Sequence, residues 1–123
     1  MTDDRHRYGQ SGEQLAVAFL EANGYTILER NFRTRLGEID IIARHKGVLV
    51  FVEVKARRSR RHGDPKWALT PAKQRKISMT ALVYLKRQGS TQVRARFDVV
   101  TVQRIDGRPQ VELIRNAFDL AYA

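Results

Sequence analysis

The charged residues of one predicted β-hairpin form the pattern in this chain that most clearly suggests chemistry. The stretch GEIDIIARHKGVLVFVEVK, residues 37–55, is mostly apolar, but the end away from its turn carries Glu38, Asp40, Glu53 and Lys55. Carboxylates that lie next to each other in a sheet repel unless a cation neutralises them. Mg²⁺ binds through one or two carboxylates and fills its remaining positions with water and substrate phosphate. The pattern therefore indicates a metal site for phosphate chemistry.

The expected register of this hairpin brings two of its acids together. A two-residue turn at Lys46-Gly47 makes Asp40 face Glu53 across the strands. Directly opposed like charges destabilise a strand pair by up to ~1 kcal/mol, so folding does not require this arrangement. Side-chain alternation also predicts one apolar, covered face of the hairpin, which consists of Ile39, Ile41, Ala43, Val50, Val52 and Val54.

Lys55 lies two residues beyond Glu53, so its side chain is expected on the same side of the strand. An ammonium group at that point can hold an attacking water or stabilise the charge that grows on a phosphoryl group. The structural alternative is a solvated salt-bridge cluster, in which Glu38 lies opposite Lys55 and no ligand is bound.

Two polar residues at helical spacing extend the candidate site. Glu13 falls on the apolar stripe of a predicted helix, where it is either a third acid directed toward the metal or an acid that complements the helix dipole. Gln74 holds a comparable position on a second predicted helix. Its amide is either an accessory group that orients water or phosphate, or a hydrogen-bonded core glutamine.

The elements that must position these residues follow the order α-β-β-β-α-β-β, which predicts an α/β fold with a mixed sheet flanked by helices. Residues 1–10 are expected to form a flexible tail before a single domain at 11–120, since 123 residues suffice for one core. The capping pattern of Ser11 and Gln14 starts the first helix, and Thr70-Pro71 starts the second. The predicted segments are 12–23, 25–33, 37–55, 71–88, 95–104 and 109–115.

The charge of the chain favours a polyanionic partner. Lysine and arginine number 23 against 13 acids, a formal net charge of +10, so nucleic acid is the expected ligand, with a merely basic protein as the alternative. A basic loop leaves the sheet directly after Lys55, beside the proposed metal. The residues expected to contact phosphates are Arg33, Arg35, Arg57, Arg58, Arg60, Arg61, Lys66 and Lys73.

The composition also excludes several kinds of site. The chain contains no cysteine, which rules out disulfides, thiolate zinc sites and cysteine nucleophiles. Its polar N-terminus and short apolar runs predict neither a signal peptide nor a membrane partner, so a cytoplasmic location is expected. His6, His45 and His62 are assigned to surface positions, and Asp98 either faces the site or pairs inward with an arginine.

Four segments of the sequence resemble a known family. GEIDIIA, VFVEVKAR, KQRKI and RFDVV are similar to the YraN family of small bacterial proteins, which is itself similar to archaeal Holliday junction resolvases. The Asp…Glu-x-Lys pattern resembles that of the PD-(D/E)xK nuclease superfamily, with Ile39 in the position of its proline. The resemblance implies a restriction-endonuclease-like fold, Mg²⁺ or Mn²⁺ bound by Asp40, Glu53 and Glu13, and catalysis that uses Glu13, Asp40, Glu53, Lys55 and Gln74.

The expected function is therefore metal-dependent endonucleolytic cleavage of nucleic acid, with DNA, including branched DNA, as the expected substrate. The principal alternative is a non-catalytic nucleic-acid-binding module that keeps the nuclease-like fold. A protein-interaction domain with an incidentally basic surface is a third reading. Whether two chains pair as a homodimer to cut two strands is left open by the sequence.

Overall fold

The computed structural model describes residues 4–57, 69–89 and 93–118, with side chains from residue 12 onward except that of Arg57. Two helices and five strands follow the predicted order α-β-β-β-α-β-β, which confirms the restriction-endonuclease-like α/β fold. The elements are α1 (Asp4–Ala22), β1 (Thr26–Arg33), β2 (Glu38–His45), β3 (Val48–Arg57), α2 (Pro71–Arg87), β4 (Ala95–Ile105) and β5 (Arg108–Phe118).

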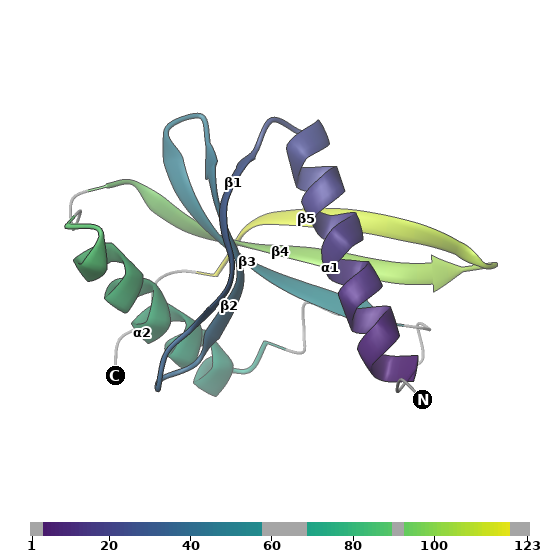
Figure 1. The fold of residues 1–123 in the computed structure, drawn as a ribbon, viewed down its shortest axis with the longest axis horizontal. Coiled ribbons are helices and arrows are strands. Elements are labelled where there is room, and N and C mark those ends of the chain that lie inside the picture. The colour runs from purple at the N-terminus through teal and green to yellow at the C-terminus, as the bar shows by residue number, and fades with distance from the viewer. Residues whose placement is uncertain (1–3, 58–68, 90–92, 119–123) are drawn as a thin grey trace.

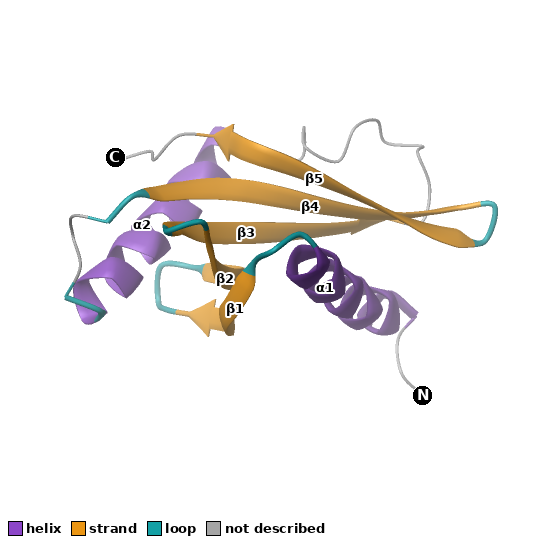
Figure 2. Cartoon of the chain, turned by 90° about the horizontal axis from the view of Figure 1, so that it is seen from above, coloured by secondary structure: helices purple, strands orange, loops and turns teal. Residues whose placement is uncertain are grey.

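The five strands form one mixed sheet in the order β1-β2-β3-β4-β5. The β3–β4 pair is parallel and the other three pairs are antiparallel. A parallel pair needs a long crossover connection, and the segment between β3 and β4 contains α2. Figures 1 and 2 show α2 and α1 on either side of β1 and β2, and the far end of the β4–β5 hairpin projecting beyond α1.

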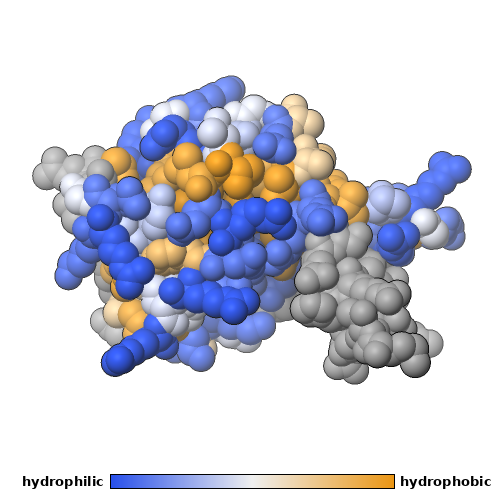
Figure 3. All heavy atoms as spheres, in the orientation of Figure 1, coloured by the Kyte–Doolittle hydropathy of each residue, from blue (hydrophilic) through white to orange (hydrophobic). Residues whose placement is uncertain are grey.

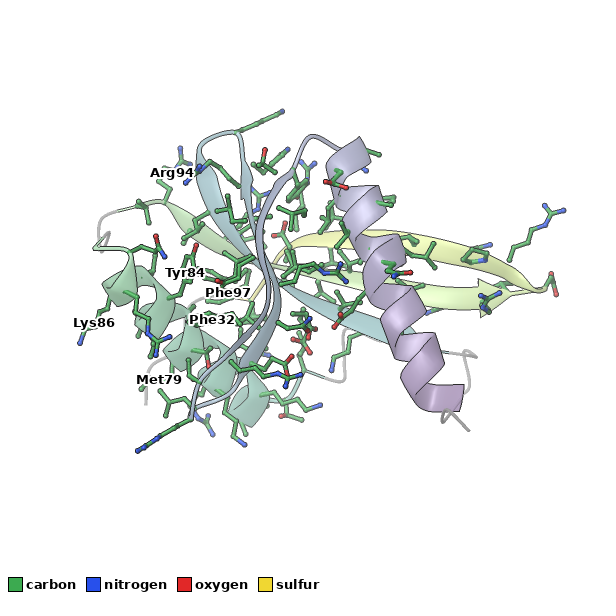
Figure 4. All side chains as sticks on the ribbon, in the orientation of Figure 1. Phe32, Met79, Tyr84, Lys86, Arg94 and Phe97 are labelled. Atoms are coloured by element: carbon green, nitrogen blue, oxygen red, sulfur yellow. The ribbon has the colours of Figure 1, made fainter. Side chains whose placement is uncertain are left out.

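Each helix covers one face of the sheet with an apolar core of its own. The core under α2 is aromatic: Phe32 and Tyr84 meet edge to face at 5.3 Å between ring centroids, and Phe97 packs in the same cluster (Figure 4). The core under α1 contains smaller and branched side chains: Ala16, Leu20, Ile41, Ala43, Val50, Val52, Val100 and Val102. The two cores hold the β2–β3 hairpin from both sides and fix the site at its open end.

The second helix starts as predicted, whereas the first does not. The hydroxyl of Thr70 accepts the backbone N–H of Lys73 at 3.2 Å, and Pro71 is the first helical residue. The first helix begins at Asp4, so the prediction of a tail over residues 1–10 and a helix start near 12 was wrong for residues 4–10. The Ser-x-x-Gln pattern is a local signal, and a helix that is already formed propagates through it because each added residue gains a hydrogen bond.

Close packing between α1 and β3 predicts the effect of a small substitution. A Cβ added at Gly12 would lie 2.9 Å from the Cβ of Ala56, closer than two such atoms approach in proteins. We expect Gly12→Ala to lower the free energy of unfolding by about 1–2 kcal/mol, although alanine has the higher helix propensity. Urea unfolding measures this, with Gln14→Ala on the exposed side of α1 as a neutral control. Equal or greater stability of Gly12→Ala would contradict the packing.

The face drawn in Figure 3 is largely hydrophilic, with apolar atoms gathered near its centre. Within the described residues, the large apolar side chains that are exposed are Leu28, Leu36 and Val93. No helix of the described chain is both long enough and apolar enough to cross a membrane.

Candidate metal and phosphate site

The acids Asp40 and Glu53 meet at the open end of the β2–β3 hairpin. The predicted register is confirmed from the pair of His45 and Val48 at the turn to the pair of Ile41 and Val52. The regular pairing ends there, one step short of the acids. In its place an Asp40 carboxylate oxygen, Oδ2, accepts the backbone N–H of Val54 at 2.8 Å.

The departure from regular pairing coincides with a local distortion of the neighbouring strand. Asn31 on β1 lies opposite Asp40 and has a φ of +54°, in the left-handed region. The alternation of β2 breaks at this level, so Ile39 and Ile42 both pack in the core under α2 while Ile41 packs under α1. The prediction that Ile39 shares a face with Ile41 was therefore wrong. A regular-strand pattern contains no information about such a kink.

Burial and mutual repulsion control the protonation of the acid pair. Burial, followed by the charge of Glu53, raises the pKa of Asp40 to about 8, and the charge of Glu13 adds to the rise. Burial also raises the pKa of Glu53, against the opposing effect of Lys55. The two carboxyl groups hydrogen-bond to each other. In the absence of a cation, the pair therefore retains a proton at neutral pH.

Lys55 joins the acid pair as the sequence predicts. Its Nζ lies 3.4 Å from Oε1 of Glu53, and both side chains are largely buried, with 16% and 18% of their surface exposed. Within the salt-bridge alternative, the placement of Glu38 opposite Lys55 was wrong, because Glu38 pairs with Arg33 at 3.3 Å, whereas the Lys55–Glu53 pair is present. The ammonium group is thus held at the acids rather than at the outer rim of the sheet.

Glu13 approaches the same acids from α1. It is 24% exposed, lies 3.7 Å from a guanidinium nitrogen of Arg30, and its charge reaches Asp40. Among the residues with described side chains, no group of three or more histidines or acids is arranged to hold a metal ion. Glu13 therefore lies near the acid pair without forming a three-ligand set with it in this arrangement.

The two candidate residues of α2 differ in their contacts. Gln74 is partly buried, and its side-chain amide donates a hydrogen bond to the carbonyl of Leu69 at 3.0 Å. This bond links α2 to the segment just before its first turn. An accessory role for Gln74 remains a prediction. Lys73 is exposed, and its charge counteracts the raised pKa of Glu53, so it lies within electrostatic reach of the acid pair.

The predicted phosphate contacts are only partly covered by the described residues. The side chains of Arg33 and Arg35 are exposed around the turn between β1 and β2. Arg57 ends β3, where its backbone pairs with Gln103 on β4. Four further residues lie outside the described part of the chain: Arg58, Arg60, Arg61 and Lys66.

A buried polar network lies elsewhere in the sheet, and the sequence analysis largely missed it. Asp98 has no exposed surface and accepts hydrogen bonds from Tyr25 at 2.9 Å, Arg96 at 3.0 Å and the backbone of Asn116 at 2.9 Å. These contacts confirm the alternative in which Asp98 pairs inward with an arginine.

The same network contains a histidine. His45 is only 4% exposed, so its assignment to the surface was wrong. Its ring stacks on Tyr25 at 4.2 Å, and its Nδ1 lies 3.0 Å from a guanidinium nitrogen of Arg96. Burial, followed by the charge of Arg96, lowers the pKa of His45. The Arg96-x-Asp98 spacing on one strand face was the sequence signal for this cluster, whereas the histidine had none.

The donor set at Asp40 and Glu53 fits a hard divalent cation. The two carboxyl groups are in hydrogen-bond contact, they are partly buried, and they retain a proton that a cation would replace. Mg²⁺ and Mn²⁺ prefer oxygen ligands, and Mg²⁺ in particular keeps several waters beside one or two carboxylates. The residues present therefore suit such an ion with two carboxylate ligands.

A mixed sheet with one helix on each face and this element order is a restriction-endonuclease-like α/β fold. The chain belongs to the uncharacterised protein family UPF0102, the YraN family, whose model matches residues 12–102. The predicted family is thereby confirmed.

Relatives in this family cover nearly the whole chain. The UPF0102 protein of Desulfosudis oleivorans is 57% identical over 97% of this chain and 95% of its own length. The UPF0102 protein STH1475 of Symbiobacterium thermophilum is 56% identical over 91% of this chain and 96% of its own. A solved structure titled "Crystal structure of SSO0001" is 15% identical with a TM-score of 0.34, and the match covers 90% of this chain and about half (51%) of that chain.

Proposed function

We propose that the protein is a metal-dependent nuclease that hydrolyses phosphodiester bonds, with DNA as its substrate and Mg²⁺ or Mn²⁺ held by Asp40 and Glu53. The observation that carries this proposal is the acid pair itself. Two partly buried carboxyl groups touch, with a lysine ammonium 3.4 Å from one of them. Repulsion between the two carboxylates and the loss of their hydration make this arrangement unfavourable for folding. A bound divalent cation would offset both costs.

The side chains around the pair have separate tasks. A bound divalent ion would polarise the phosphate and lower the pKa of a water molecule. The backbone N–H of Val54 fixes one oxygen of Asp40, and the carboxylate would bind the ion in place of the proton shared with Glu53. Lys55 holds the attacking water and stabilises the charge that develops on the phosphate. Glu13 adds negative potential from α1.

The nucleic-acid part of the proposal is supported by charge and its placement. The formal net charge is +10, and the exposed residues Arg33, Arg35 and Lys73 lie on the elements that border the acid pair. Contacts of this kind recognise phosphates without reading bases. A protein that only bound DNA would keep this surface and would show no chemistry at the acids, so metal binding distinguishes the two functions.

Metal binding should depend on pH because the acid pair must lose its proton. The pKa of Asp40 is about 8, so below that value each ion displaces a proton and its affinity should fall by up to ~tenfold per pH unit. Above about pH 8 the affinity should level off. Calorimetric titration with Mn²⁺ between about pH 6 and pH 9, in two buffers of different ionisation enthalpy, measures both the affinity and the released proton.

The matched variant for this titration is Asp40→Asn, which keeps the size of the side chain and removes the charge. It should bind no Mn²⁺ at the site at any pH, whereas Glu38→Gln on the same strand should behave as the wild type, because Glu38 pairs with Arg33 away from the acid pair. Mn²⁺ binding that is equally tight in Asp40→Asn, or that does not change between pH 6 and pH 8, would contradict the proposed ligands.

A further inference from the structure

Arg30 lies on the α1 side of the sheet, in contact with Glu13, because the backbone of β1 is distorted beside it. In a regular strand, residues two apart share a face, so Arg30 and Phe32 would point the same way. Here Phe32 packs in the core under α2, while Arg30 pairs with Glu13 of α1 on the other side of the sheet. Asn31, between them, has a φ of +54°, which reverses the alternation. The position of Arg30 is thus a result of this kink.

The alternation of side chains along the neighbouring strand, β2, also reverses at this level of the sheet. Ile39 packs under α2 and Ile41 under α1, with Asp40 between them and opposite Asn31. One distortion therefore redirects the side chains of both strands around the acid. Asparagine adopts a left-handed backbone more readily than other non-glycine residues, so this kink costs little.

Stability does not account for the placement of Arg30. The nitrogen–oxygen distance to Glu13 is 3.7 Å and the side chain of Arg30 is 41% exposed, and ion pairs of this kind contribute little. A guanidinium group carries five N–H donors in a planar fork. One long contact to Glu13 and the high exposure leave donors of Arg30 accessible to a ligand that approaches the acids.

We propose that Arg30 binds a phosphate of the nucleic-acid strand that lies over Asp40 and Glu53. This inference rests on the proposed function and adds a substrate contact to it. Arg30 contacts Glu13, whose charge acts on Asp40, and Lys55 contacts Glu53, so each cation adjoins one member of the acid cluster. The planar guanidinium group matches two oxygens of a phosphodiester, which an ammonium group cannot do.

The test is DNA binding measured with and without a divalent cation. The anisotropy of a labelled duplex and of a labelled four-way junction is followed in Ca²⁺ and in chelator, across a series of salt concentrations. The variants are Arg30→Gln, Arg30→Lys and Arg44→Gln. Arg44 is the matched control, since it is an exposed arginine on β2 that lies next to the hairpin turn, away from the acids.

Arg30→Gln should weaken DNA binding in Ca²⁺ by about tenfold or more and lower the salt slope by ~0.9 on duplex DNA, because one charge-assisted phosphate contact is lost. Arg30→Lys should be intermediate, since it keeps the charge without the fork. Arg44→Gln should keep the wild-type ratio of affinities in Ca²⁺ and in chelator. Thermal melts check that each variant folds, and Arg30→Lys alone still decides the question if Arg30→Gln does not fold.

Glu13→Gln separates a phosphate contact from a merely structural role. If Arg30 binds phosphate, the loss of its acidic partner leaves DNA affinity in chelator equal or higher. If Arg30 serves only to position Glu13, then Arg30→Gln and Glu13→Gln weaken DNA binding to the same extent, and the proposal is overturned. It is also overturned if Arg30→Gln keeps the wild-type affinity and slope. If the wild type binds DNA equally well in Ca²⁺ and in chelator, the metal site of the proposed function is contradicted. The salt slope of Arg30→Gln then tests the phosphate contact of Arg30 by itself.

Discussion

Asp40→Asn and Glu53→Gln should each reduce metal-dependent cleavage by at least ~10²–10³-fold, the scale of one lost electrostatic contact to a transition state, while the protein remains folded. The expected loss is large because each variant removes a carboxylate that the proposed cation needs. The backbone contact of Asp40 survives in the asparagine variant, since an amide oxygen can also accept the N–H of Val54.

Asp40→Asn should become more stable than the metal-free wild type as the pH rises. The folded-state pKa of Asp40 is about 8 against an ordinary value of 3.8, so the fold disfavours the charged form. Metal-free wild type should therefore lose stability between about pH 4 and pH 8, and asparagine, which does not titrate, should not. We expect Asp40→Asn to be more stable than wild type by at least about 1 kcal/mol near pH 8, since each unit by which the fold raises the pKa of Asp40 costs ~1.4 kcal/mol. Urea unfolding in chelator measures the difference.

Glu38→Gln is the control for both readouts, because it removes an acid from the same strand without touching the pair. It should keep cleavage and should not show the stability gain at high pH. A destabilised Asp40→Asn protein in chelator would show instead that the acids stabilise the fold as ordinary salt-bridge partners, and the metal hypothesis would lose its physical basis.

Asp98→Ala should lower the free energy of unfolding by about 3–5 kcal/mol, the typical cost of breaking a buried charged pair. Asp98 has no exposed surface, and its loss leaves three donors without their acceptor, among them the guanidinium group of Arg96. For a domain of this size the melting temperature should fall by roughly 10 °C or more. Calorimetry or urea unfolding measures it.

The control for this prediction is Glu112→Ala, which removes an exposed acid from β5 and should change stability by less than ~0.5 kcal/mol. Asp98→Asn should be milder than Asp98→Ala, and its Mn²⁺ response should match that of the wild type. An Asp98→Asn protein that is fully stable but no longer binds Mn²⁺ would place Asp98 in the metal site, against the contacts in the structure.

Local signals were sufficient for most of the fold. The Lys46-Gly47 turn fixed the hairpin register as far as Ile41 and Val52, and Thr70-Pro71 located the start of α2. The convergence of Lys55 with the acid pair followed from that register and from side-chain alternation. These features depend on neighbours in sequence or on one turn, so the pattern of residues determines them.

The features that the sequence analysis missed depend on tertiary contacts. Asn31 on β1 has a left-handed backbone, and at the same level of the sheet Ile39 on β2 packs on the other face, which no periodic pattern predicts. His45 is polar and sits beside a turn, yet Tyr25 and Arg96 from other strands bury it. The first helix begins at Asp4 and runs through Ser11 and Gln14, a local pattern that by itself predicts a helix start near residue 12.

Cleavage of labelled linear, nicked, flapped and four-way-junction DNA, with Mg²⁺, with Mn²⁺ and with chelator, tests the central claim most directly. Wild type and Asp40→Asn are purified and compared side by side at the same concentration. The acid pair predicts cleavage of at least one substrate by wild type in the presence of either ion, and none in chelator or by Asp40→Asn. No cleavage of any substrate by a folded wild type that binds Mn²⁺, or cleavage that Asp40→Asn retains, would contradict it.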